Sequence, residues 1–339
     1  MEYERELNKR VITIAGINYT LKECFQKGFE FEQNKKYQEA AYWYELIAKE
    51  KHFVAQYNLA SLYYNGFLPQ NRYNKAIYWY RQSAELGYPL AQNYLGEAYI
   101  HGYGVKQDYR IAISWFEMAA KHGCAESQNN LGQIYMNGYV VSRDYEKAYY
   151  YFEMAAQQGF PVAQNNLGYC YEKGKGTEKN HNKAFNYYTK AANQGLMDAQ
   201  YNLALCYFYA RGVKKDLILA VYWFEAAAKQ GHVDSQYNLA KSYYTGSGVT
   251  LNFTQAFNWF EKAAKQGHVS LQDYLAHLYY YGQGVIKNYQ EAIYWYEKAA
   301  KSGVVDSQYM LGVCLYEGKG VKQDYESAFK WFKQAAKKK

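Results

Sequence analysis

The sequence predicts an all-α solenoid of nine helix-turn-helix repeats, and two regularities carry this prediction. An alanine recurs every 36 residues, and an aromatic residue follows each alanine three positions later. The alanines are Ala40, Ala76, Ala112, Ala148, Ala184, Ala220, Ala256, Ala292 and Ala328. All seven tryptophans occupy the aromatic position, and Tyr151 and Tyr187 take it in the other two repeats. One helical hairpin cannot bury its own apolar face, so copies must stack on one another.

The repeats account for nearly all of the 339 residues and leave no room for a separate catalytic domain. We divide the chain into an N-terminal non-repeat segment (1–16), a first repeat (17–52) and eight regular repeats (53–339) that form one solenoid domain. The first repeat has the shorter connection of an ordinary tetratricopeptide repeat. An atypical end repeat is expected of a solenoid cap.

The first helix of each regular repeat carries a glutamine, then an apolar and a small residue three and four positions later, as in Gln92, Leu95 and Gly96. This spacing places them on one helical face, and the small residue allows the second helix to cross close by. A glycine such as Gly102 should end the helix in a left-handed cap. Only Ala210 departs from glycine at this position.

From the third repeat on, the second helix should begin after an Asp or Asn cap, and a second helix that is followed by another regular repeat should end before a glycine, as between Asn288 and Gly303. Its tryptophan or tyrosine is expected to pack into the interface between neighbouring helices. A further aromatic position on the first helices is expected to be buried throughout. Its members are Tyr63, Tyr99, Tyr135, Tyr171, Tyr207, Tyr243 and Tyr279.

The net charge of +8 is scattered through helix ends and loops, with three charges at residues 337–339, and this favours a solvated surface over a nucleic-acid interface. The Gly-x-Gly loops lack the Gly-Lys-Ser/Thr motif and the preceding strand of a phosphate-binding loop and are expected to be turns. His122, His232 and His268 flank glycines between repeats and lack ligand spacing. The sequence therefore predicts no metal, no cofactor and no catalytic residues.

Five cysteines give an odd count without paired spacing. Cys170, Cys206 and Cys314 share one repeat position that elsewhere takes small or apolar residues, so they are expected to fill the core in a reducing compartment. The apolar run at residues 11–17 is too short for a signal peptide, and no run approaches a membrane span. We therefore expect a cytoplasmic protein, with translocation into a host left open.

Residues 91–123 carry the pattern A-x-x-x-L-G-x-x-Y-x-x-G-x-G-V-x-x-D-x-x-K-A-x-x-W-Y-x-x-A-A-x-x-G most fully. In this pattern the chain resembles the Sel-1-like repeat family, 36-residue relatives of tetratricopeptide repeats. The resemblance implies a right-handed superhelix whose first helices line a concave groove, and a role as an adaptor or scaffold for other proteins. Some bacterial members are described as binding penicillin-like compounds, but they carry a cysteine pair in each repeat that this chain lacks.

If the first helices line a groove, its inward positions are polar in the N-terminal half, where Asn and Gln would suit the backbone of an extended peptide. In the C-terminal half they become aromatic, and exposed aromatic residues are typical of binding surfaces. The candidate partner-binding residues are Tyr201, Phe208, Tyr209, Tyr237, Tyr244, Tyr280, Tyr281, Tyr309 and Tyr316. They are expected to form a continuous stripe outside the core. The alternative is that these rings pack against neighbouring first helices.

The sequence thus favours a non-enzymatic scaffold that binds a partner protein or peptide. The abundance of Lys, Asn and Tyr favours a bacterial regulator or host-interacting effector. A protein that binds or hydrolyses penicillin-like compounds and a nucleic-acid binder are the alternatives, and salt dependence of binding would distinguish the latter.

Overall fold

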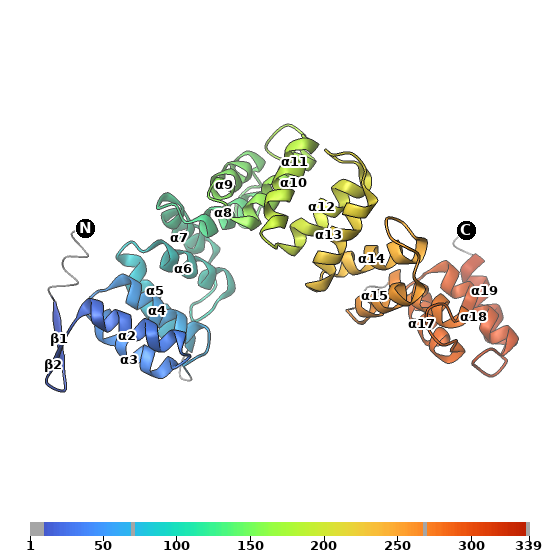
Figure 1. The fold of residues 1–339 in the computed structure, drawn as a ribbon, viewed down its shortest axis with the longest axis horizontal. Coiled ribbons are helices and arrows are strands. Elements are labelled where there is room, and N and C mark those ends of the chain that lie inside the picture. Colours follow the sequence, from blue (N-terminus) through green and yellow to red (C-terminus); the bar gives the residue numbers. More distant parts are fainter. Residues whose placement is uncertain (1–9, 69–71, 267–269, 337–339) are drawn as a thin grey trace. The chain divides into compact units, whose positions relative to one another are not determined.

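The computed structural model describes residues 10–68, 72–266 and 270–336. Residues 1–9 of the predicted N-terminal segment, as well as His268 and residues 337–339, lie outside the described residues. In the described part, a β-hairpin precedes eighteen helices that follow one another as antiparallel pairs, so the predicted all-α repeat architecture is confirmed (Figure 1).

Each pair consists of a first and a second helix. The first helices are α2 (Leu21–Gln33), α4 (Phe53–Tyr64), α6 (Pro89–His101), α8 (Ala125–Asn137), α10 (Pro161–Lys173), α12 (Met197–Tyr209), α14 (Val233–Thr245), α16 (Ser270–Tyr281) and α18 (Val305–Glu317). The second helices are α3 (Tyr37–Ala48), α5 (Arg72–Glu85), α7 (Tyr109–Lys121), α9 (Tyr145–Gln157), α11 (His181–Asn193), α13 (Leu217–Lys229), α15 (Phe253–Lys265), α17 (Tyr289–Lys301) and α19 (Tyr325–Ala336).

The hairpin consists of β1 (Val11–Ile14) and β2 (Ile17–Thr20), which pair antiparallel with Val11 opposite Thr20. Ala15 and Gly16 form the turn at φ of 50° and 81°, as a two-residue hairpin loop requires. The sequence analysis did not predict this hairpin, which crosses the expected boundary between residues 16 and 17. Thr20 also begins α2, where its side chain and that of Glu23 form a capping box.

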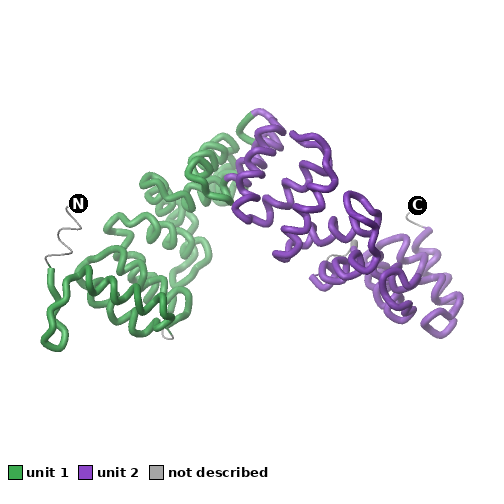
Figure 2. Tube along the Cα trace, viewed as in Figure 1, with its two compact units in different colours: residues 1–163, 175–177 green, residues 164–174, 178–339 purple. Residues whose placement is uncertain are grey.

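The chain divides into two compact units (Figure 2). Unit 1 comprises residues 1–163 and 175–177, and unit 2 comprises residues 164–174 and 178–339.

The deepest core position lies one residue after the expected tryptophan. In unit 1 the side chains of Tyr44, Tyr80, Phe116 and Phe152 are at most 1% exposed, as are Tyr188, Phe224, Phe260 and Tyr296 in unit 2. Among the tryptophans, only Trp295 is buried, at 9% exposure. One residue is about 100° on a helix, so the tryptophans turn to the flank and pack at the edges of the core clusters instead.

The small residue of the first helix faces this deep ring. A Cβ atom added at Gly96 would lie 2.5 Å from the Phe116 ring, and one at Gly132 would lie 2.5 Å from that of Phe152. The helices of a pair therefore touch ring against backbone, which explains the glycine or alanine at this position. The sequence analysis also expected one tyrosine position of the first helices to be buried in every repeat. This expectation is mostly wrong, because only Tyr171 is buried and the equivalent tyrosines are half-buried.

The predicted helix caps are confirmed. Asp108 accepts hydrogen bonds from the backbone N–H groups of Arg110 and Ile111, and Asn288 accepts from those of Gln290 and Glu291. The other second helices with a described cap bond begin in the same way, after Asp144, Asn180, Asp216, Asn252 and Asp324.

Candidate protein-binding face

A ladder of glutamines holds the first helices in register. In six repeats the glutamine side chain donates to the carbonyl of an alanine eight residues earlier, in the preceding second helix, at 2.9–3.4 Å. The donors are Gln56, Gln92, Gln128, Gln200, Gln236 and Gln308, each at most 7% exposed. Each bond satisfies a carbonyl at the end of a helix, where no further turn provides a donor.

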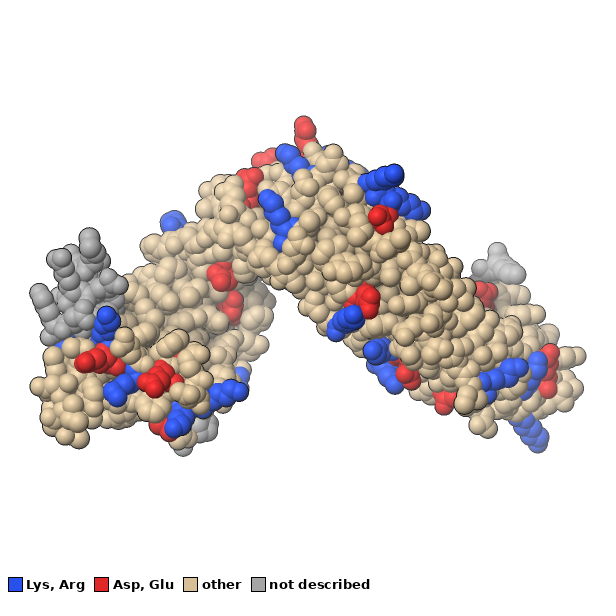
Figure 3. Space-filling view, in the orientation of Figure 1, with Lys and Arg blue, Asp and Glu red and all other residues tan. Residues whose placement is uncertain are grey.

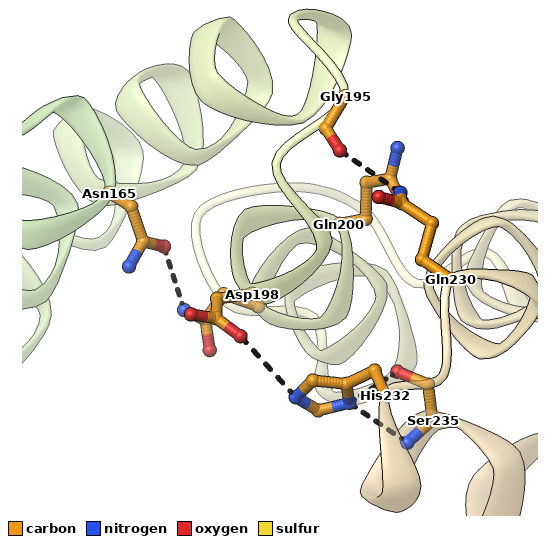
Figure 4. A network of polar contacts seen from close by, with 8 residues as sticks. Asn165, Gly195, Asp198, Gln200, Gln230, His232 and Ser235 are labelled. Carbon is orange, nitrogen blue, oxygen red and sulfur yellow. Dashed lines mark hydrogen bonds and ion pairs between the residues drawn. The ribbon is translucent and has the colours of Figure 1, made fainter. Parts of the chain in front are cut away.

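The oxygen of the same side chain accepts a bond from the turn thirty residues later. Gln158 donates to Gln128, Gln194 to Gln164, Gln230 to Gln200 and Gln266 to Gln236, at 2.8–2.9 Å. Figure 4 shows the Gln230–Gln200 bond beside a second bond, from Gln230 to the carbonyl of Gly195 at 3.0 Å. The ladder glutamine thus joins its own helix to both neighbouring second helices.

Three described donor positions of the ladder lack glutamine. His122 takes one of them, and its ring lies 3.5 Å from the side-chain oxygen of Gln92. Leu86 and Ser302 take the other two, thirty residues after Gln56 and Gln272, and leave gaps. The oxygens of both these glutamines are buried without a hydrogen-bond partner. Buried polar atoms are normally paired, so the gaps cost stability.

A second set of polar contacts joins neighbouring first helices of unit 2. Asn202 donates to Asn165 at 2.9 Å, and the imidazole of His232 lies 3.7 Å from the carboxylate of Asp198 (Figure 4). Burial lowers the pKa of His232. The neutral ring then accepts at Nδ1 from the backbone N–H of Ser235, which caps α14.

The nine candidate partner-binding residues all lie in unit 2 but do not form one continuous exposed stripe. Tyr209, Tyr281, Tyr309 and Tyr316 are 54–56% exposed. Tyr201, Phe208, Tyr237 and Tyr244 are half-buried. Because α14 contributes no exposed ring, Tyr209 stands apart from the other three. We call Tyr281, Tyr309 and Tyr316, on α16 and α18, the tyrosine face.

The half-buried rings pack on the deep aromatic core. Tyr201 and Phe208 lie 6.0 and 6.3 Å from Phe224, and Tyr237 and Tyr244 lie 6.3 and 6.4 Å from Phe260, measured between ring centroids. Tyr237 also contacts Tyr274 on the next first helix, at 6.2 Å. These four rings are therefore packed, but only Tyr237 and Tyr244 meet the next first helix, at Tyr274, as the alternative expected. Tyr201 and Phe208 pack on the second helix of their own repeat.

The expectation that Tyr280 lies outside the core is wrong, because its side chain is only 7% exposed. Its ring contacts Tyr281, Tyr289 and Tyr296 at 4.9–6.3 Å. The ammonium group of Lys319 donates to its hydroxyl at 3.1 Å and covers the ring. Removal of Tyr280 would therefore test core packing rather than binding.

The tyrosine face has apolar support and mixed charge. Tyr309 lies 5.6 Å from the ring of Phe332 and borders a hollow of about 490 Å³ that Val305 and Ala335 also line. Lys319 and Glu317 form an ion pair at 2.6 Å nearby. On the side of the molecule shown in Figure 3, positive and negative side chains are interspersed.

The polar positions of the first helices in unit 1 are also partly structural. Asn93 and Asn129 are only 3% and 4% exposed, so the expectation that they meet a peptide backbone is wrong. Asn93 accepts hydrogen bonds from Ser127 at 2.8 Å and from Asn130 at 3.2 Å, across to α8. Asn93 thus holds α6 and α8 together.

All five cysteines are buried and free of disulfides. Burial raises the pKa of Cys170 and of Cys206 to about 12, so both stay protonated at neutral pH. The described residues contain no group of three metal-ligating side chains. No described helix has the length and apolar character to cross a membrane.

Stacked helical hairpins with an exposed face of tyrosines define a helical repeat protein. The Sel1 repeat matches residues 23–52, 54–88, 89–124, 125–160, 161–196, 198–232, 233–268, 270–304 and 305–339, and the chain belongs to this family. Among curated proteins, none matches the chain.

Two solved structures share the fold over most of the chain. One is c5321, a protective antigen present in uropathogenic Escherichia coli strains, which is 32% identical with a TM-score of 0.73. The match covers 93% of this chain and 76% of that one. The other is a Sel1 repeat protein from Oxalobacter formigenes, 31% identical with a TM-score of 0.61, covering 94% of this chain and 90% of that one.

Proposed function

We propose that this protein is a non-enzymatic scaffold that binds a segment of a partner protein across the tyrosine face of unit 2. The observation that carries the proposal is that three rings, each more than half exposed, stand on helices whose inner faces are fixed by the aromatic core. Tyrosine loses little conformational entropy on binding and is enriched among the residues that dominate binding energy. A solenoid of this family generally supports protein–protein interaction.

The proposal includes a cytoplasmic location and a bacterial regulatory or host-interacting role. The reduced, buried cysteines support the location. Similarity to a protective antigen of uropathogenic Escherichia coli supports the role. The alternative activity on penicillin-like compounds gains no support from the geometry, because the cysteines lie singly in the core rather than as a pair in each repeat.

The test compares two double variants of the full chain. Tyr281→Ala/Tyr309→Ala removes two rings of the tyrosine face. Tyr222→Ala/Tyr294→Ala removes two rings that are equally exposed, at 59% and 49%, but stand on second helices of the same unit. Both variants should keep the free energy of unfolding within about 1 kcal/mol per site.

Proteins captured by each immobilised variant would be quantified by mass spectrometry against the wild type. A partner of the tyrosine face should lose about 30-fold or more in affinity with the first variant, which corresponds to roughly 2 kcal/mol, and keep its affinity for the second. If the two variants lose the same proteins equally, or if only the second loses them, the assignment of the face is wrong.

A further inference from the structure

A pocket of about 390 Å³ opens in unit 1 between α6, α8 and the start of α7. Phe116 and Ile134, 1% and 6% exposed, form its apolar base, and Ile100 and Tyr109 line it as well. Tyr139, 59% exposed, also borders it. The volume falls in the range of pockets that hold a small ligand or a single large side chain.

Polar side chains also line the pocket, namely Glu97, His101, Gln107, Asn130 and Gln133, and among them only Glu97 is acidic. Asn93 donates to its carboxylate at 3.0 Å, and Asn130 donates as well. Asn93 is itself fixed by hydrogen bonds from Ser127 and Asn130. The carboxylate is therefore held in place by neighbouring first helices before any ligand arrives, which lowers the entropy cost of binding.

Glu97 has no ion-pair partner within the described ranges. Burial raises its pKa despite the two amide donors. His101, one turn later on α6, acts to lower this pKa but forms no ion pair with Glu97, and Glu126 on α8 raises it. A desolvated carboxylate without a cation is unfavourable, and an added cation would relieve that cost.

Glu172 in unit 2 provides the contrast. Its carboxylate accepts from Lys173 at 2.7 Å, from Arg211 at 3.2 Å and from Tyr188 at 2.9 Å. Burial would raise the pKa of Glu172, but these partners hold it below its usual value. The chain thus pairs the carboxylate of Glu172 with its own cations and leaves that of Glu97 without one.

The acidic group is also peculiar to this repeat. The residues equivalent to Glu97 in the other regular repeats are Ser61, Gln133, Tyr169, Leu205, Lys241, His277 and Val313. None of them carries a carboxylate, so the acidic pocket does not follow from the repeat architecture alone.

We propose that the Glu97 pocket binds the cationic side chain, arginine or lysine, of a partner protein. The carboxylate would pair with the charged head, while Ile100, Tyr109 and Phe116 contact the aliphatic stem, and the exposed ring of Tyr139 adds a cation–π contact at the mouth. An anionic ligand would be repelled, and a neutral one would leave the carboxylate without a counter-charge. The proposal rests on the protein-binding function above but uses a surface of unit 1 rather than the tyrosine face.

The probes are three acetylated and amidated pentapeptides of alanine with arginine, lysine or citrulline at the centre. Citrulline keeps the shape of arginine without its charge. Affinity for the full chain would be measured by saturation-transfer NMR titration at neutral pH. The wild type should bind at least one cationic peptide about tenfold or more tightly than the citrulline peptide, as expected for a charge-assisted pair.

Two variants locate the effect. Glu97→Gln keeps the size of the side chain and its ability to accept from Asn93, and it should abolish the preference for the cationic peptides. Glu172→Gln removes a carboxylate that is already paired and should leave the preference unchanged. Thermal unfolding of both variants confirms that they are folded.

The proposal is overturned if neither cationic peptide binds the wild type at peptide concentrations up to about 10 mM, because a dissociation constant above this value is too weak for a specific contact. It is also overturned if the citrulline peptide binds as well, or if Glu97→Gln retains the preference. These variants leave the tyrosine face intact. Failure of the peptide test together with retained capture of a partner by the tyrosine face would therefore refute this inference alone. A successful peptide test without capture by the tyrosine face would refute only the proposed function.

Discussion

Replacement of Ser302 by glutamine should close a gap in the glutamine ladder and stabilise unit 2. The side chain of Gln272 presents a buried oxygen without a partner, thirty residues before Ser302. In four other repeats a glutamine at the equivalent position donates to that oxygen at 2.8–2.9 Å. The new amide therefore has a known geometry to adopt.

The magnitude follows from two opposing contributions. An unsatisfied buried acceptor costs about 1–3 kcal/mol. Ordering a glutamine side chain costs up to about 1.5–2 kcal/mol, and less at a helix end that is already ordered. Ser302 is exposed, and its own bond to the carbonyl of Lys298, at 3.1 Å, is within a helical turn and easily replaced by water. The net gain should be about 1 kcal/mol.

Native-state hydrogen exchange is the suitable assay, because a repeat protein opens locally rather than as one two-state unit. Amides of α16 and α17 should exchange about fivefold more slowly in Ser302→Gln, the factor that corresponds to about 1 kcal/mol. Ser302→Glu is the matched control, since glutamate has the length of glutamine but places a carboxylate, which cannot donate, next to the oxygen of Gln272. If the glutamine variant protects these amides no better than the glutamate variant, the ladder does not contribute to stability as we have argued.

Two further predictions concern single residues. Ala210 ends α12 in the left-handed conformation, at φ 57°. Ala210→Gly should therefore stabilise the protein by about 0.5–1 kcal/mol in urea denaturation, whereas Gly246→Ala at the equivalent position should destabilise it by a similar amount. Equal denaturation midpoints for both variants would contradict the argument that Ala210 is strained. Burial raises the pKa of Glu97 above its usual value of 4.5. Between the pKa of the unfolded chain and the higher pKa of the folded state, the folded state binds more protons than the unfolded chain. The free energy of unfolding should therefore fall as pH rises through this window. Glu97→Gln should remove that contribution, at most about 1.4 kcal/mol per pH unit, and parallel stability profiles of wild type and variant between pH 4.5 and neutrality would refute the assignment.

The period of the sequence was enough to predict the helices, their caps and the number of repeats, because each of these depends on local spacing. It did not distinguish Trp115 from Phe116 as the deeper core residue. Both positions are aromatic in every repeat, and only their rotation about the helix axis separates them. The glycine opposite, Gly96, was the available signal, since only a ring in direct contact with backbone requires so small a neighbour.

The candidate site was harder to predict because exposure depends on contacts between repeats. Tyr244 and Tyr280 occupy equivalent positions, but Lys319, in the loop of the following repeat, covers Tyr280 alone. Its equivalent one period earlier is Gln283. The Glu97 pocket escaped the sequence analysis for a similar reason. A carboxylate at one position was visible, but the two asparagines that donate to it, Asn93 and Asn130, come from two different helices.

The two spacings of the glutamine ladder affect how such a chain can change in length. Its bonds join residues eight or thirty positions apart, and both intervals are shorter than the 36-residue period. Duplication or loss of one whole repeat therefore gives every ladder glutamine an equivalent partner at the same offset. An insertion of any other size within a thirty-residue interval separates a donor from its acceptor and leaves a buried amide unpaired. Selection for paired amides thus permits growth and shrinkage of this protein in steps of one repeat and penalises intermediate lengths.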